Sequence, residues 1–140
     1  MAVRLTILCA AVLGLGAGSF AVAAAPAPTL DYNFFKTRVQ PIFLKKREGH
    51  ARCVVCHGGA NNALHLAPLP ASGQWSEEDT KNNFAAVSAL VNAADPANSR
   101  LLIHPLAPEA GGDLFHSGGR QFATKDDPDW KTLAQFAGVK

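Results

Sequence analysis

The chain has 140 residues, with 13 Lys and Arg against 11 Asp and Glu, and a formal net charge of +2. A single compact domain fits this length, and a near-neutral chain gives no reason to expect binding to nucleic acid. No internal repeat is present, so we expect one domain and one site.

Residues 1–25 have the features of a cleaved signal peptide. Arg4 supplies the positive n-region, a short apolar run follows, and A-x-A cleavage sites end at Ala23 and Ala25. The apolar run is short for a membrane span. We therefore expect an exported, periplasmic domain of residues 26–140 without stable membrane insertion, with an uncleaved N-terminal anchor as the alternative.

The mature chain begins with a predicted helix from Tyr32 to about Lys45. Asp31 can cap its N-terminus, and apolar residues recur on one face. These residues are Phe34, Phe35, Val39, Ile42 and Phe43. Pro41 lies inside the pattern and is expected to kink or restart the helix, because proline lacks the N–H that the helix needs.

The segment Cys53-Val54-Val55-Cys56-His57 carries the attachment signature of c-type haem. In this signature the two thiols add across the haem vinyl groups as thioethers, and the histidine becomes the proximal ligand of the iron. A dithiol redox centre would need a surrounding βαβ pattern, which is not visible, and a zinc site would need two further ligands. We expect one covalent haem c, held by Cys53, Cys56 and His57.

Short elements follow the motif. Residues 61–73 are predicted to form a loop whose leucines alternate toward an apolar partner. Ser76 and Asp79 have the spacing of a capping box, which predicts a helix from about Glu77 to Val91. Asp95 and Pro96 are expected to start a short helix that runs through Ser99 to Ile103.

A long Gly-rich loop and a terminal helix complete the chain. The loop covers residues 105–124, and a loop of this length is uncommon in a compact domain unless it is functional. Asp127 and Pro128 then predict the start of a helix that runs to about Ala137. Since no alternating strand pattern is present, the expected fold class is all-α, with short helices and long loops wrapped around one haem.

The lack of methionine in the mature chain limits which residue can be the sixth ligand of the iron. The only methionine is Met1, which cleavage would remove, so the mature protein cannot use His/Met ligation. The position is then open or filled by another side chain, for which the histidines are the main candidates and lysine and Tyr32 are remote ones. His50 is too close to the motif to reach the opposite haem face easily, and His65 stands between two leucines that would turn it away from the apolar side. His116 in the Gly-rich loop is favoured, and His104 is the main competitor.

Several stretches together resemble the planctomycete-type cytochrome c domains of bacteria. The resemblance extends from about Phe34 to Phe136, although only the haem motif is specific by itself. It is carried by Phe35-x-x-x-Val39-Gln40-Pro41-Ile42-Phe43, by Cys53-x-x-Cys56-His57-Gly58, by Pro96-x-x-Ser99-x-Leu101-Leu102, by His116-Ser117-Gly118-Gly119-Arg120-Gln121-Phe122 and by Asp126-Asp127-Pro128-Asp129-Trp130-x-x-Leu133.

The resemblance implies that His116 occupies the place where other branches of that family carry the distal methionine. Two positions depart from the family pattern, since Ser117 replaces a glycine and Phe136 stands where tryptophan is frequent. Arg120 in the same stretch can pair with a haem propionate, although a solvent-exposed arginine is the default expectation.

These observations favour electron transfer over catalysis. An iron with both axial positions filled by His57 and His116 has no vacant site for substrate, so we expect a non-enzymatic carrier that serves redox partner proteins. Two alternatives stay open. One is a haem protein that binds or senses a small molecule at a displaceable distal ligand, and the other is a haem subunit of a larger redox complex.

Overall fold

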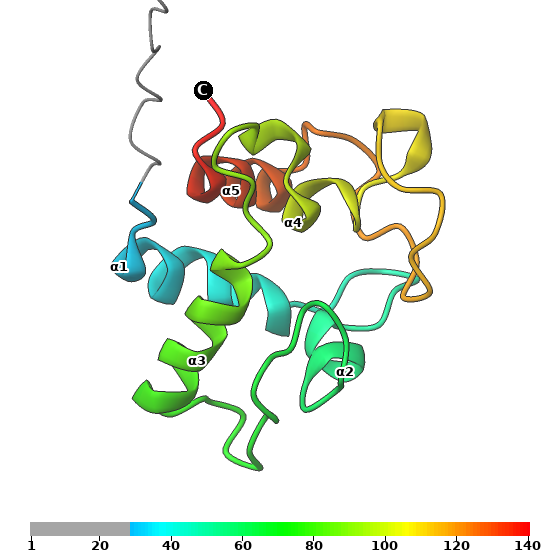
Figure 1. Cartoon of the computed structure of the whole chain (residues 1–140). Coiled ribbons are helices and arrows are strands. Elements are labelled where there is room, and N and C mark those ends of the chain that lie inside the picture. Colours follow the sequence, from blue (N-terminus) through cyan, green and yellow to red (C-terminus); the bar gives the residue numbers. More distant parts are fainter. Residues whose placement is uncertain (1–28) are drawn as a thin grey trace, which may run out of the picture.

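The computed structural model describes residues 29–140, and the predicted signal peptide of residues 1–25 lies outside them (Figure 1). The described residues form helices joined by loops, with isolated bridges and no sheet, which confirms the all-α class. No helix of this part of the chain is both long and apolar enough to cross a membrane.

The described residues contain five α-helices, one π-helical segment and three 3-10 turns. The α-helices are α1 (Tyr32–Phe34), α2 (Cys53–His57), α3 (Glu77–Ser88), α4 (Arg100–Ile103) and α5 (Pro128–Ala137). The turns are the π-helical η1 (Phe35–Val39) and the 3-10 turns η2 (Gln40–Leu44), η3 (Pro96–Asn98) and η4 (Pro108–Ala110). In Figure 1, α4 and α5 lie above the helical segment of residues 32–44, and α2 lies near the end of that segment.

The first predicted helix is one helical segment whose winding changes before Pro41. Asp31 caps it, since its Oδ1 accepts a hydrogen bond from the Phe34 N–H at 3.0 Å. The Gln40 N–H then bonds to the Phe35 carbonyl, which is the longer π-helical step, and a 3-10 turn follows. Because the proline ring clashes with the carbonyl four residues earlier, a regular α-helix cannot continue through this point. The predicted kink is confirmed.

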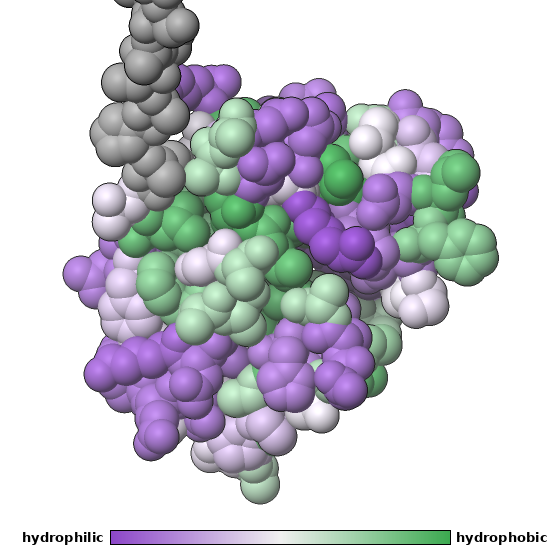
Figure 2. Space-filling model, viewed as in Figure 1, coloured by the Kyte–Doolittle hydropathy of each residue, from purple (hydrophilic) through white to green (hydrophobic). Residues whose placement is uncertain are grey.

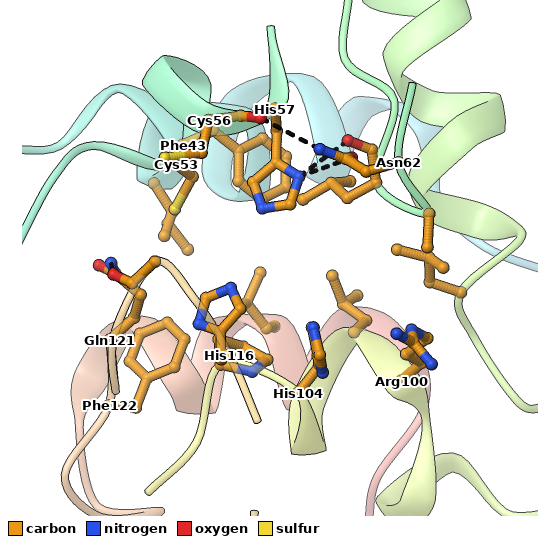
Figure 3. Close-up of a pocket in the computed structure, with 18 of the residues that line it drawn as sticks. Phe43, Cys53, Cys56, His57, Asn62, Arg100, His104, His116, Gln121 and Phe122 are labelled. Atoms are coloured by element: carbon orange, nitrogen blue, oxygen red, sulfur yellow. Dashed lines mark hydrogen bonds between the residues drawn. The ribbon is translucent and has the colours of Figure 1, made fainter. Parts of the chain in front are cut away.

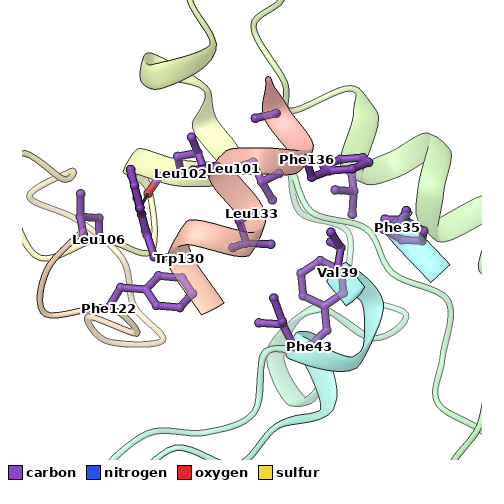
Figure 4. Close-up of a cluster of buried hydrophobic side chains, with 14 of the residues drawn as sticks. Phe35, Val39, Phe43, Leu101, Leu102, Leu106, Phe122, Trp130, Leu133 and Phe136 are labelled. Carbon is purple, nitrogen blue, oxygen red and sulfur yellow. Dashed lines mark hydrogen bonds between the residues drawn. The ribbon is translucent and has the colours of Figure 1, made fainter. Parts of the chain in front are cut away.

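The core lies between α5 and the segment of residues 35–43 (Figure 4). Its largest side chains come from distant parts of the chain and are all buried. They are Phe35, Val39, Phe43, Leu66, Leu102, Leu106, Phe122, Trp130, Leu133 and Phe136. The one polar group of the buried Trp130 side chain also has a hydrogen-bond partner. Its Nε1 donates to the Leu102 carbonyl at 3.2 Å, and this bond joins α5 to α4.

The predicted ends of two helices need correction. The capping box of Ser76 and Asp79 is present, but α3 ends at Ser88 and not at Val91. Beyond Ser88, the N–H groups of Leu90 and Val91 bond to carbonyls three residues earlier, at 3.0 and 3.1 Å, so the last turn tightens and the α-helix ends. The Leu90 carbonyl then accepts from the Leu101 N–H at 3.2 Å, a contact with α4. The single short helix predicted from Asp95-Pro96 to Ile103 is instead two elements, the 3-10 turn η3 and helix α4, with Ser99 between them in a non-helical conformation. The terminal helix, with its cap at Asp127, has its predicted bounds.

Candidate functional site

A cavity of about 230 Å³ lies between α2 on one side and α4 with the Gly-rich loop on the other (Figure 3). Its floor is apolar, with Ile42, Phe43, Leu64, Leu90, Leu101 and Leu133 among its lining side chains. A few polar groups converge on this apolar space, which is the usual composition of a ligand site. Both cysteines of the motif line the cavity, together with His57, His104 and His116.

Helix α2 places the motif on the cavity wall. It is a single helical turn that ends where the Gly58 N–H bonds to the Val54 carbonyl at 2.8 Å. A Cβ atom at Gly58 would lie 2.7 Å from that carbonyl oxygen, so the turn requires glycine there. Cys53 and Cys56 remain free thiols in this turn, and burial raises the pKa of the Cys53 thiol. Two unlinked thiols therefore stand beside the cavity.

The imidazole of His57 is held by its Nδ1 atom. This nitrogen lies 2.9 Å from Asn62 Oδ1 and 3.0 Å from the Leu64 carbonyl oxygen, both of which accept its hydrogen. Asn62 is itself positioned, since its Nδ2 donates to the Cys56 carbonyl at 3.1 Å. With the hydrogen on Nδ1, the Nε2 atom keeps its lone pair for the cavity, as a metal-ligating histidine requires.

His116 faces His57 from the opposite wall. The ring centres are 6.3 Å apart and the ring planes are inclined by only 17°, and Figure 3 shows both rings directed into the same space. The Nδ1 atom of His116 donates to the Gly119 carbonyl at 2.5 Å. Burial lowers the pKa of His116, and the nearby His104 and His57 lower it further, although the bond to Gly119 opposes them. Its neutral, ligating form is thereby favoured.

The loop that carries His116 is tied to the chain before the motif. Gln121 Nε2 donates to the Ala51 carbonyl at 3.3 Å and to the Gly118 carbonyl at 3.1 Å. Gly119 has a φ of +84°, and a Cβ atom there would lie 2.9 Å from His50 Nδ1. The two walls of the cavity are thus joined near the cysteines.

His104 lines the same cavity beside His116. Their ring centres are 4.8 Å apart with the planes at 64°. The Nδ1 atom of His104 pairs with Asp113 Oδ2 at 2.8 Å, and the Asp113 N–H donates to the Ile103 carbonyl at 3.0 Å. The structure therefore brings both candidate ligands to the cavity, and it is His116 whose ring stands nearly parallel to that of His57. His65 is exposed, and its Nδ1 bonds to the Ala60 carbonyl.

Three polar residues of the cavity were not predicted from the sequence. Asn62 orients His57, Gln121 joins the walls, and Arg100 stands at one end of the cavity. Asn62 and Gln121 lie in loops without periodicity. Gln121 bonds to backbone carbonyls, and Asn62 bonds to the Cys56 carbonyl and the His57 ring, so no periodic pattern of side chains marks either residue. Arg100 stands at an unspecified position of the stretch Pro96-x-x-Ser99-x-Leu101-Leu102 and belongs to no motif of its own.

Comparisons with protein-family models, curated proteins and solved structures gave no match for this chain. Within residues 29–140, no group of three or more His, Cys, Asp or Glu side chains is arranged to hold a metal ion. The donor groups of the cavity are instead a pair of thiols on one wall and imidazoles on both walls.

Proposed function

We propose that this protein is a periplasmic c-type cytochrome that transfers single electrons between redox partner proteins. One haem would be held in the cavity by thioether bonds to Cys53 and Cys56, with His57 and His116 as the axial ligands of the iron. The observation that carries this proposal is the pair of imidazoles that face each other across a cavity whose wall also bears two free thiols.

The donor set fits this cofactor. A metal–imidazole bond is about 2.0 Å long, so two such bonds on opposite sides of one ion, with the ring centres behind the nitrogens, span roughly 6 Å. The 6.3 Å between the ring centres of His57 and His116 agrees with this span. His57 and His116 would hold the iron between them, and the apolar lining of the cavity would supply a suitable surface for a flat macrocycle.

The residues have separate tasks in this proposal. When bound, the haem supplies an iron that cycles between the ferrous and ferric states. Cys53 and Cys56 would keep the cofactor attached, and Asn62 holds His57 in the tautomer that presents Nε2. His116 would be the second protein ligand of the iron, which would leave no site open for substrate. Imidazole in place of methionine at this position gives a lower reduction potential than in His/Met cytochromes.

The proposal is tested with exported protein in three forms: wild type, His116→Ala and His104→Ala. Wild type should retain one haem per chain after acid–acetone extraction and show a low-spin, six-coordinate spectrum. His116→Ala should make the ferric haem high-spin and open the ferrous form to carbon monoxide, because it removes the sixth ligand. His104→Ala is the matched control from the same cavity and should keep the low-spin spectrum.

Each contrary result has a defined meaning. Loss of haem into the acid–acetone extract would overturn the c-type cytochrome. A high-spin His104→Ala protein would move the axial ligand to His104. A wild type that is already high-spin and binds carbon monoxide would replace electron transfer by small-molecule binding at the distal side.

One observation favours a second candidate, a haem subunit within a larger redox complex. Leu114 and Phe115, just before His116, are 88% and 86% exposed, and Figure 2 shows apolar surface protruding on the side of the Gly-rich loop. Large apolar side chains are rarely so exposed in pairs beside a functional loop. Native mass measurement on protein from its own cells tests this candidate, and a monomer would contradict it.

A further inference from the structure

Arg100 is a cation on the cavity wall that has no carboxylate partner among residues 29–140. Several other cations of this part of the chain pair with carboxylates, namely Lys36, Lys45, Arg47, Arg120 and Lys131. Arg120, the residue for which the sequence suggested a propionate, pairs with Glu109 at 3.2 Å on the surface. A guanidinium remains charged at any physiological pH, so Arg100 leaves a positive charge at the cavity without a protein counterion.

The backbone of Arg100 is firmly anchored although its side chain is exposed. Arg100 is the first residue of α4, and the buried Ser99 before it accepts a hydrogen bond from the Asn92 N–H through its Oγ at 2.9 Å. The next two residues, Leu101 and Leu102, are buried in the core. These contacts hold the start of α4 in place, so the guanidinium starts from a fixed point on the cavity wall.

The position of Arg100 along the cavity is specific. Figure 3 shows Cys53 and Cys56 at one end of the cavity, His57 and His116 in the middle, and Arg100 at the opposite end. A second cavity-lining arginine without an ion pair in the described chain, Arg52, directly precedes Cys53 and therefore belongs to the cysteine end. The two arginines mark opposite ends of the same site.

The chemistry of haem distinguishes these two ends. Its vinyl groups sit on two neighbouring pyrroles and its two propionates on the other two, so the propionates point away from the edge that the cysteines would hold. Carboxylates that enter a partly buried site need cations or strong hydrogen-bond donors. Arginine meets this need best, because its planar fork can donate two hydrogen bonds to one carboxylate.

We propose that Arg100 binds a haem propionate and thereby tunes the reduction potential of the iron. This inference rests on the function proposed above. A positive charge held near the haem favours the ferrous state, which carries one positive charge less, and so raises the potential. The same ion pair keeps the propionate ionised through the neutral pH range, so the potential of wild type should vary little with pH in that range.

The experiment measures the midpoint potential against pH by spectroelectrochemistry on the exported holoprotein. Arg100→Gln should lower the potential and make it fall with rising pH in the neutral range, because an unpaired propionate then titrates there. Arg100→Lys keeps the charge but loses the fork, and its curve should lie between the two. Arg52→Gln removes an equal charge from the cysteine end, and it should lower the potential by the same amount at every pH.

The control separates a propionate partner from a general charge effect. Parallel curves for Arg100→Gln and Arg52→Gln would overturn the assignment of Arg100 while the covalent haem and its two histidines stand. If Arg100→Gln is not exported, Arg100→Lys carries the test, and a curve identical to wild type would overturn the assignment. A wild-type protein without covalent haem would instead overturn the function on which the inference depends.

Discussion

Asp127 performs two tasks that two substitutions can separate. As the N-cap of α5, its Oδ1 accepts from the Asp129 N–H at 2.8 Å and from the Trp130 N–H at 3.3 Å. Its Oδ2 accepts from Arg47 Nη1 at 2.9 Å, which ties the chain before the haem motif to α5. Asp127→Asn keeps an oxygen for the cap and removes the charge, whereas Asp127→Ala removes both.

The expected losses of stability follow from these contacts. An N-cap contributes about 1 kcal/mol. The side chains of Arg47 and Asp127 are 14% and 24% exposed, so solvent screens their pair in part, and Asp129 also pairs with Arg47. We therefore expect the pair to contribute about 1 kcal/mol. Asp127→Asn should cost about 1 kcal/mol and Asp127→Ala about 2 kcal/mol, with a fall in Tm of about 4 °C for each 1 kcal/mol.

The pH dependence of this contribution has a definite sign. Burial raises the pKa of Asp127, but the hydrogen bond from Arg47 and those from the N–H groups of Asp129 and Trp130 outweigh it, so the pKa lies below its ordinary value of 3.8. A carboxyl with a lowered pKa stabilises the fold above its unfolded pKa. That stability is lost as the pH falls below 3.8 and through the lowered pKa of the folded state.

Thermal unfolding of the purified protein, followed by far-ultraviolet circular dichroism at neutral and acidic pH, measures these effects. The difference between wild type and Asp127→Asn should shrink as wild-type Asp127 becomes protonated. Equal losses for the two variants would show that the cap contributes nothing. A difference that persists unchanged at acidic pH would refute the role given to the ion pair.

Two further predictions concern single residues. In a denaturant titration, Gly112→Ala should destabilise the fold by about 2–3 kcal/mol, because the new Cβ would lie 2.0 Å from the Leu106 carbonyl oxygen and the backbone would have to move. Gly73→Ala is the control, since Gly73 has a positive φ but open space around it, and it should cost about 1 kcal/mol. Equal costs for the two variants would contradict the steric reason. Tyr32 is the only tyrosine, and its hydrogen bond to Glu77 raises its pKa to about 12. Ultraviolet titration should show the phenol ionising near that pH in wild type and at lower pH in Glu77→Ala, and an unchanged titration in Glu77→Ala would contradict this. Stability that the bond contributes should be present below pH 10 and lost as the pH rises toward 12.

The sequence by itself determined the features that depend on neighbouring residues. The bounds of α5 were predicted correctly because Asp127 and Pro128 start a helix locally and Gly138, with a φ of +88°, ends it. The capping box of Ser76 and Asp79 and the disturbance at Pro41 were local in the same sense. The two cysteines and the histidine of the motif likewise lie within five consecutive residues, so their spacing could be taken directly from the sequence.

Only the tertiary structure decided which distant groups share the cavity with that motif. From the sequence, His104 and His116 were both eligible to face His57, because the path of a long Gly-rich loop is not encoded in a periodic pattern. The fold brings the two histidines together and orients the ring of His116 parallel to that of His57. The contact of the Leu90 carbonyl, just beyond the end of α3, with the Leu101 N–H of α4 is likewise not marked in the sequence. Contacts across the chain depend on how the core packs, and local preferences do not report them.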